Sequence, residues 1–310
     1  MSIICIAGPT ASGKTALAVA MAKALDGEVI SCDSMQIYRG MDIGTAKPTV
    51  QEMAGIPHHM LDVAEPGEDF SVSRYCTLAD PILQDILSRG KTAIIAGGTG
   101  LYMDALIRGN AFAPYPSTGM REKLEVEAEE LGMEAMLEKL RNIDPHAAEK
   151  LHIADRKRII RALEVWYETG KTITEHNLMT QAIPPKYQPV WFGLEDENRA
   201  DLYARIDRRV DAMLDAGLMD EIKALLDRGI SEKSTAMQAI GYKEFVDVLQ
   251  GEFSLQEATD RVKQASRHYA KRQLTWFRRN PQIHWLRRSP TDDTDKILAR
   301  ARQYLGEFDN

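Results

Sequence analysis

The sequence predicts an α/β fold: a parallel sheet core flanked by helices, with an all-helical insertion domain. In the N-terminal part, short apolar stretches alternate with stretches in which apolar residues recur at helical spacing. Such alternation implies parallel strands that bind ligands at their carboxyl ends. Between Arg121 and Gly170 the apolar spacing is helical throughout, which predicts a separate helical region.

The same spacing places the individual elements. We expect buried strands at residues 3–7, 28–31, 91–96, 190–194 and 283–286. We expect helices at residues 15–25, 71–89, about 198–228, 238–250 and 254–278. Gly90 is expected to follow the end of the second of these helices. In the helical region, Asp155 is predicted to cap the start of a helix that ends at Gly170.

Two proline-rich joints mark the expected domain boundaries. Pro114-Tyr115-Pro116 and Ile183-Pro184-Pro185 flank the helical region. Proline ends helices and favours an extended chain in the residue before it. We therefore predict a core domain formed by residues 1–115 and 186–310, and a helical insertion domain at residues 116–185.

A complete phosphate-binding motif lies between the first strand and the first helix. It fits G-x-x-x-x-G-K-[ST] and consists of Gly8, Pro9, Thr10, Ala11, Ser12, Gly13, Lys14 and Thr15. Glycine lets backbone N–H groups turn toward a phosphate, and the start of the following helix adds its dipole. Lys14 supplies a positive charge, and the Thr15 hydroxyl is the predicted ligand of Mg²⁺. The core is therefore predicted to be of the P-loop type and to hold a pyrophosphate-bearing substrate.

The residues that follow the second and third strands bear on the chemistry. Ile94-Ile95-Ala96 runs into Gly97-Gly98-Thr99, whereas a hydrolysing NTPase places an Asp there to hold its metal. A pyrophosphate ligand that is not hydrolysed is therefore favoured. Asp33 follows the second strand, across the crevice from the phosphate loop, where it can accept a proton or hold Mg²⁺ through water. Spacing alone leaves open that Asp33 and Thr99 serve only their turns.

Composition indicates a globular protein of 310 residues, with 44% hydrophobic and 27% charged residues. No apolar run is long enough to cross a bilayer, and Met1–Ile6 lacks the features of a signal peptide. We therefore expect a cytoplasmic protein that does not bind membranes. Cys5, Cys32 and Cys76 form no metal-binding pattern and are expected to be reduced thiols.

The charge of the chain is unevenly distributed. The net charge is −7, yet residues 261–288 contain nine cations and no Asp or Glu. These cations are Arg261, Lys263, Arg267, Lys271, Arg272, Arg278, Arg279, Arg287 and Arg288. They predict a local basic face that binds a polyanion. Aromatic side chains and a histidine that lie among these cations would suit contact with RNA bases, namely His268, Tyr269, Trp276 and Phe277. Helical spacing leaves open that Trp276 and Phe277 are buried in the core.

Seven segments, in order over most of the chain, resemble the tRNA dimethylallyltransferases. Four lie in the first third, namely GPTASGKT at 8–15, CDSMQIYRGMDIGTAKP at 32–48, PHHMLD at 57–62 and GGTGLY at 97–102. Three lie later, namely RALEVWYETGK at 161–171, IGYKE at 240–244 and AKRQLTWFRR at 270–279. No Cys/His ligand spacing occurs near Asn310, so the resemblance is to the bacterial type without a zinc finger.

The resemblance implies a reaction. The family transfers a dimethylallyl group from dimethylallyl diphosphate to N6 of the adenosine just 3′ of the anticodon (A37), in tRNAs that read codons beginning with U. Diphosphate leaves and Mg²⁺ assists. The implied partners are the tRNA anticodon stem-loop and dimethylallyl diphosphate, and we expect a monomer.

The resemblance also assigns roles by position. Asp33 matches the general base, and Thr99 matches the threonine near the bridging oxygen of the diphosphate. Arg209, in RIDRRV at 205–210, matches the diphosphate-binding arginine, with Arg205 as a second; spacing alone would make both a solvated helix face. The implied tRNA contacts are Asp33, Ser34, Met35, Gln36, Thr99, Arg121, Lys157, Arg158, Ile159, Ile160, Arg161, Gly241, Tyr242 and Lys243. Lys271 and Arg272 of the basic stretch join this set.

Two other functions stay open on the sequence. A small-molecule kinase would use the same loop for ATP and Asp33 as its base, although a small acceptor needs no basic stretch. A non-catalytic RNA-binding protein gated by a nucleotide would need the loop but no base at Asp33.

Overall fold

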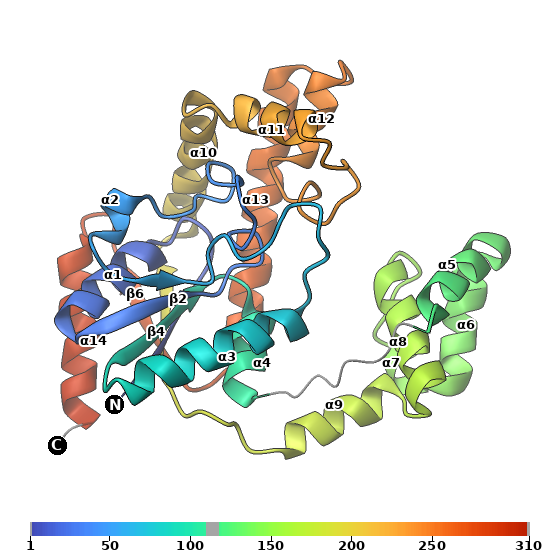
Figure 1. The fold of residues 1–310 in the computed structure, drawn as a ribbon, viewed down its shortest axis with the longest axis horizontal. Coiled ribbons are helices and arrows are strands. Elements are labelled where there is room, and N and C mark those ends of the chain that lie inside the picture. Colours follow the sequence, from blue (N-terminus) through green and yellow to red (C-terminus); the bar gives the residue numbers. More distant parts are fainter. Residues whose placement is uncertain (1, 110–117, 309–310) are drawn as a thin grey trace. The chain divides into compact units, whose positions relative to one another are not determined.

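The computed structural model describes residues 2–109 and 118–308. The Pro114-Tyr115-Pro116 joint, and with it the predicted boundary between residues 115 and 116, lies outside these ranges. The chain divides into two compact units. One combines Met1–Gly109 with Lys186–Asn310, and the other is Asn110–Pro185 (Figure 1).

The core of the first unit is a six-stranded parallel sheet, which confirms the predicted fold class. The strands are β1 (Ile3–Ala7), β2 (Gly27–Ser31), β3 (His58–His59), β4 (Thr92–Gly97), β5 (Val190–Asp196) and β6 (Ile283–Arg288). Their order in space is β3-β2-β4-β1-β5-β6. The two-residue β3 was not predicted, because an edge strand this short leaves no periodic pattern. Three connections, from β1 to β2, from β3 to β4 and from β4 to β5, therefore each pass over one strand, and β1 lies between β4 and β5.

Helices cover both faces of the sheet (Figure 1). On one face, α1 (Lys14–Ala24) and α14 (Thr294–Phe308) pack on Ile4 and Ile6 of β1. On the other, α3 (Val72–Ser88), α4 (Gly100–Arg108) and the end of α13 (Leu255–Phe277) pack on Cys5 and Ala7. Because successive side chains of β1 are buried on opposite faces, the strand is apolar along its whole length.

The helices after β5 differ from the prediction. The predicted helix at 198–228 is two helices, α10 (Arg199–Asp215) and α11 (Leu218–Asp227), because Gly217 adopts a left-handed φ of 97° between them. The predicted helix at 238–250 shortens to α12 (Lys243–Leu249), preceded by turns. With the first half of α13, these helices bury a second apolar cluster against residues that follow β2. A single turn, α2 (Val50–Met53), was not predicted.

The second unit is helical throughout its described residues. Its helices are α5 (Met120–Leu131), α6 (Met133–Ile143), α7 (Pro145–Ala148), α8 (Arg156–Thr169) and α9 (Ile173–Ala182). Gly170 ends α8 in a left-handed conformation, as predicted. Asp155 stands at the start of α8, but its carboxylate accepts from the His152 N–H (3.0 Å) and pairs with Arg158 instead of capping the helix.

In the described part of the chain, no helix is long and apolar enough to cross a membrane. The three cysteines are free thiols, and two of them, Cys5 and Cys32, are buried. Burial raises the pKa of both buried thiols, so they are unionised and serve as core residues.

Candidate active site

The phosphate loop joins β1 to α1. Ala11 (φ 60°) and Gly13 (φ 92°) adopt left-handed conformations that turn the backbone before α1 begins at Lys14. The Lys14 ammonium lies inside this turn and donates to the Pro9 carbonyl (2.6 Å). Burial lowers the pKa of Lys14 to about 8, with Asp33 opposing the shift and Arg209 adding to it. A half-buried cation that donates to a carbonyl is well placed to bind an anion.

Two side chains hold the loop from outside. Arg205 donates from Nε to the Ala11 carbonyl (3.0 Å) and pairs with the buried Asp196 carboxylate of β5. Arg205 does not line the cavity beside the loop; it supports the loop, and its diphosphate contact stays a prediction. Arg288 of β6 donates weakly to the Ser12 carbonyl (3.4 Å). The Ser12 hydroxyl is buried and has no hydrogen-bond partner among the described residues.

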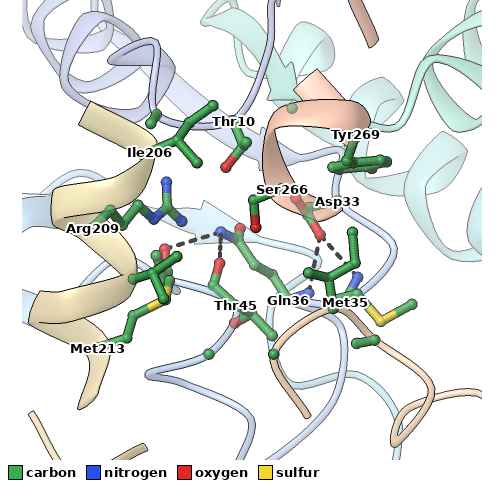
Figure 2. A pocket seen from close by; sticks show the side chains of 18 of the residues that line it. Thr10, Asp33, Met35, Gln36, Thr45, Ile206, Arg209, Met213, Ser266 and Tyr269 are labelled. Atoms are coloured by element: carbon green, nitrogen blue, oxygen red, sulfur yellow. Dashed lines mark hydrogen bonds between the residues drawn. The ribbon is translucent and has the colours of Figure 1, made fainter. Parts of the chain in front are cut away.

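The turn after β2 carries Asp33. Its Oδ1 accepts from the backbone N–H of Met35 (2.9 Å) and, at longer range, of Gln36 (3.4 Å). Both hydrogen bonds end on the same carboxylate oxygen, so they hold Asp33 in place through Oδ1. The Gln36 side chain is engaged elsewhere, donating to the carbonyls of Thr45 (3.3 Å) and Ala46 (3.1 Å). Asp33 is therefore both a turn residue and a fixed carboxylate facing the cavity (Figure 2).

Thr99 ties the turn after β4 to the turn after β2. Its N–H donates to the Cys32 carbonyl (3.2 Å), and its hydroxyl oxygen accepts from the Ser34 N–H (3.0 Å). Thr99 does not itself line the cavity; it lies beside Ser34, which does. The turn of Gly97, Gly98 and Thr99 places no carboxylate at the end of β4, as the sequence indicates.

A single cavity of about 520 Å³ brings the loop and Asp33 together. The loop lines one side from Thr10 to Ala16, and the Asp33–Gln36 turn lines another. Arg209 reaches in from α10 (Figure 2). Burial lowers the pKa of Arg209, while the charges of Asp33 and Glu52 oppose that shift. Arginine stays protonated all the same, so Lys14 and Arg209 share the cavity with the Asp33 carboxylate.

Helix α13 supplies one wall through a stripe of four residues, Val262, Ser266, Tyr269 and Gln273. They recur at helical spacing and so face the same way. Burial raises the pKa of Tyr269 to about 12, an effect that Asp33 reinforces. Tyr269 therefore remains a neutral hydroxyl beside the carboxylate. Arg272 lines the mouth of the same cavity and is exposed, as is Lys271.

In the rest of the basic stretch, several cations that were predicted to face a polyanion form ion pairs within the protein. Lys263 and Arg267 pair with Asp211 and Asp207 of α10 (2.6 Å each). Arg278 and Arg287 both approach Glu195 of β5 (3.0 and 3.5 Å). Acids from other elements thus neutralise part of a stretch that contains none of its own. Phe277 is buried, and the partly buried Trp276 donates from Nε1 to Asp104 (2.9 Å), so both serve packing.

Tyr242, which was predicted to contact RNA, has its side chain inside the fold. Its side chain is fully buried, with the ring against Gly44 and the hydroxyl donating to Glu221 Oε1 (2.6 Å). The Glu221 carboxylate also accepts from the backbone N–H groups of residues 42–44 (2.8 to 3.1 Å). Tyr242 therefore borders the cavity as a core residue. Its neighbour Lys243 is exposed, and Gly241 is buried.

In the helical unit, the predicted contacts surround a separate cavity of about 700 Å³. It is lined by Arg121, Lys157, Arg158, Ile160 and Arg161, among others. The cations are exposed, and Arg121 and Arg161 share Glu164 (2.9 and 2.7 Å). Ile159 is fully buried in the core of this unit, so its side chain is not available for an RNA contact.

Sequence reasoning missed Gln273 and Glu52, which line the cavity, and Glu221, which holds residues beside it. Gln273 lies in the segment at 270–279 that resembles the family, four residues after Tyr269. A polar side chain on a helix face that is otherwise packed could have indicated its role. Nothing local marks Glu221, because its partners lie about 180 residues earlier in the chain. Glu52 lines the cavity from α2, which no apolar pattern predicts.

Comparison with known proteins agrees with this site. The family model described as IPP transferase matches residues 36–280, most of the chain. This chain belongs to that family. A second model, isopentenyl transferase, matches residues 1–65, which include the phosphate loop.

Relatives within the family cover nearly the whole chain. The tRNA dimethylallyltransferase of Acetivibrio thermocellus is 46% identical over 308 residues, 99% of this chain and 98% of the relative. That of Caldanaerobacter subterraneus subsp. tengcongensis is 49% identical over 92% of this chain and 91% of its own. The fold is similar to the crystal structure of a full-length tRNA isopentenylpyrophosphate transferase from Bacillus halodurans, at 44% identity and a TM-score of 0.74. That match covers 99% of this chain and 97% of the other.

A eukaryotic dimethylallyltransferase crystallised while acting on tRNA is similar at 31% identity, with a TM-score of 0.82. The match covers 99% of this chain and 80% of that one. The predicted family is therefore confirmed by sequence and by fold, and a small-molecule kinase is not favoured.

Proposed function

We propose that this chain transfers the dimethylallyl group of dimethylallyl diphosphate to N6 of an adenosine in tRNA, the one 3′-adjacent to the anticodon in tRNAs that read codons beginning with U. The observation that carries the proposal is the cavity in which a phosphate loop, Arg209 and the Asp33 carboxylate meet. Family membership supports the reaction class.

The chemistry follows from the groups in the cavity. The diphosphate binds the loop amides and Lys14, with Arg209 on its other side. As the N6–carbon bond forms, the bond from that carbon to the diphosphate oxygen breaks, and negative charge builds on the leaving group. Fixed cations stabilise this charge more in the transition state than in the ground state, which lowers the barrier. The proton leaves N6 for the free oxygen of Asp33.

Thr15 is our proposed protein ligand of Mg²⁺. It lines the cavity next to Lys14, and no group of three or more His, Cys, Asp or Glu side chains in the described residues could form a metal cage. This fits Mg²⁺, which prefers few protein ligands together with substrate phosphates and water. When bound, the ion supplies further positive charge at the diphosphate.

The RNA would be held by the exposed cations. Arg272 lines the cavity from α13, with the exposed Lys271 next to it in the chain, and Arg121, Lys157, Arg158 and Arg161 lie around the cavity of the helical unit. Phosphate contacts of this kind contribute affinity that falls with salt. That affinity offsets the few kcal/mol needed to unstack the target base. We further propose that the enzyme acts as a cytoplasmic monomer.

The test is direct prenyl transfer. Protein, Mg²⁺, labelled dimethylallyl diphosphate and an anticodon stem-loop with adenosine 3′ of the anticodon are mixed, and label in the RNA is measured. A matched stem-loop carries inosine at that site, which removes the exocyclic amine and leaves the rest of the loop. We expect label with adenosine only. Equal labelling of both RNAs would contradict the acceptor atom, and phosphate transfer from ATP without prenyl transfer would contradict the reaction.

A further inference from the structure

Gln273 joins two loops that the rest of the fold brings to the cavity separately. It lies in the last third of α13 and is only 5% exposed. Its Oε1 accepts from the Thr10 N–H of the phosphate loop (2.8 Å). Its Nε2 donates to the Gly98 carbonyl of the turn after β4 (3.0 Å), a bond that is buried.

The side-chain amide of Gln273 satisfies both partners at once. The Thr10 backbone offers a donor and the Gly98 backbone an acceptor, so the bridging group needs an acceptor and a donor at once. The fit is close, because a Cβ atom on Gly98 would lie 2.1 Å from the Gln273 Nε2. Without Gln273, two polar backbone groups beside the cavity would lose their partner, which is costly where water has little access.

Each of the two loops leads to a reacting group. Four residues after Thr10, the phosphate loop ends at Lys14, which faces the diphosphate in the proposed reaction. The Gly98 turn continues into Thr99, whose hydroxyl oxygen holds the Ser34 N–H next to Asp33 (3.0 Å). A change in the distance between the loops would therefore change the distance between the leaving group and the base.

From these contacts we infer that Gln273 is a positioning residue, which fixes the phosphate loop relative to the turns that carry Thr99 and Asp33. The inference rests on the proposed prenyl transfer for its effect on rate. It predicts a loss in turnover that exceeds the loss in substrate affinity, because misplaced reacting groups still bind their ligands. Misplacement by about 1 Å is enough to lower a rate by about 100-fold.

The test compares three variants in the transfer assay. Gln273→Met keeps the length of the side chain and removes both hydrogen bonds. Gln273→Glu keeps the acceptor for Thr10 and removes the donor for Gly98. Gln264→Met is the matched control, because Gln264 is exposed on the same helix. Melting temperature and circular dichroism of each variant establish the folded fraction, and rates are taken per folded molecule.

We expect Gln273→Met to lower kcat by about 10- to 100-fold, with KM for either substrate within about threefold of wild type. Gln273→Glu should also be slow, and Gln264→Met should match wild type. A kcat within threefold of wild type for Gln273→Met, or a loss confined to KM or to the folded fraction, would overturn the inference.

Hydrogen exchange of the Thr10 amide separates this inference from the proposed function. Exchange should be faster in Gln273→Met than in wild type and in Gln264→Met, because the bond that protects the amide is gone. Unchanged exchange would refute the positioning role even if activity fell. If wild type transferred no prenyl group, the proposed function would fail, and the exchange result would still decide whether Gln273 fixes the loop.

Discussion

Replacing Asp33 by Asn tests the proposed base with little change in structure. Asp33 is held through one oxygen only, which accepts from the Met35 N–H (2.9 Å) and more weakly from Gln36. An Asn side chain retains a carbonyl oxygen for the same two donors, so the turn keeps its shape. The other oxygen becomes an NH₂ group, which cannot take a proton from the substrate amine.

The size of the effect follows from what is removed. A positioned general base contributes about 10²- to 10⁴-fold in rate, which is about 3–5 kcal/mol of activation free energy. Ground-state binding should change little, since the retained oxygen preserves the fold of the turn. Removing the negative charge takes away the carboxylate that acts on both Lys14 and Arg209, so diphosphate affinity should stay equal or rise slightly.

Single-turnover transfer at saturating substrate measures the rate, and fluorescence anisotropy with a labelled stem-loop measures RNA affinity. Gln264→Met serves as the control, because Gln264 is exposed on α13 and does not line the cavity. The reasoning would be refuted if Asp33→Asn lost RNA affinity and rate by the same factor, or if it kept more than about a tenth of the wild-type rate.

Three further predictions follow from described contacts. The pKa of Lys14 is lowered to about 8, so its charge in the free enzyme is lost as pH rises through 8. Calorimetry from pH 7 to 9.5 should show dimethylallyl diphosphate binding weaken in wild type, while Lys14→Met binds weakly throughout. The same pH dependence of affinity in both proteins would argue against a role for the Lys14 charge in binding the diphosphate. Glu28 has its pKa lowered to about 2 by the hydrogen bond from Arg89, so it stabilises the fold above pH 4.5 and this contribution disappears as pH falls toward 2. Urea unfolding should find Glu28→Gln less stable by up to about 3 kcal/mol at pH 7 and by about 1 kcal/mol at pH 3; a difference independent of pH would contradict the linkage. In Gly44→Ala, the new Cβ would lie 2.5 Å from the Tyr242 ring, and overpacking should lower stability by about 1–3 kcal/mol in the same assay; an unchanged midpoint would show that the ring moves freely.

What could be predicted from the sequence was local. The phosphate loop was found because all of its residues are consecutive and stand between a strand and a helix. The strands at 3–7 and 190–194 were found because burial on both faces makes them apolar throughout. Asp33 was located from its place at the end of a strand, and the structure confirms that this end of the sheet faces the phosphate loop across one cavity.

What could not be predicted depends on distant partners. Arg205 and Arg209 are one helical turn apart and look alike in sequence, yet Asp196 draws Arg205 behind the loop while Arg209 faces the cavity. In the sequence, all nine cations of the basic stretch look free to bind RNA. The structure shows that Asp207 and Asp211 of α10 pair with two of them. Spacing also cannot distinguish one helix of 31 residues from two helices, because Gly217 breaks the backbone without breaking the apolar period.

The bond between Thr10 and Gln273 spans 263 residues of chain, and this has a consequence for biosynthesis. The central strand β1 pairs with β5, which is made after the whole helical unit, and the phosphate loop gains its Gln273 contact later still. During translation, the first residues of the site therefore stay exposed until nearly the whole polypeptide, with their partners, has been made. Contacts of such long sequence separation slow folding. The catalytic cavity should be among the last parts of the molecule to form on the ribosome, and the longer it stays open, the more the nascent chain depends on protection from aggregation.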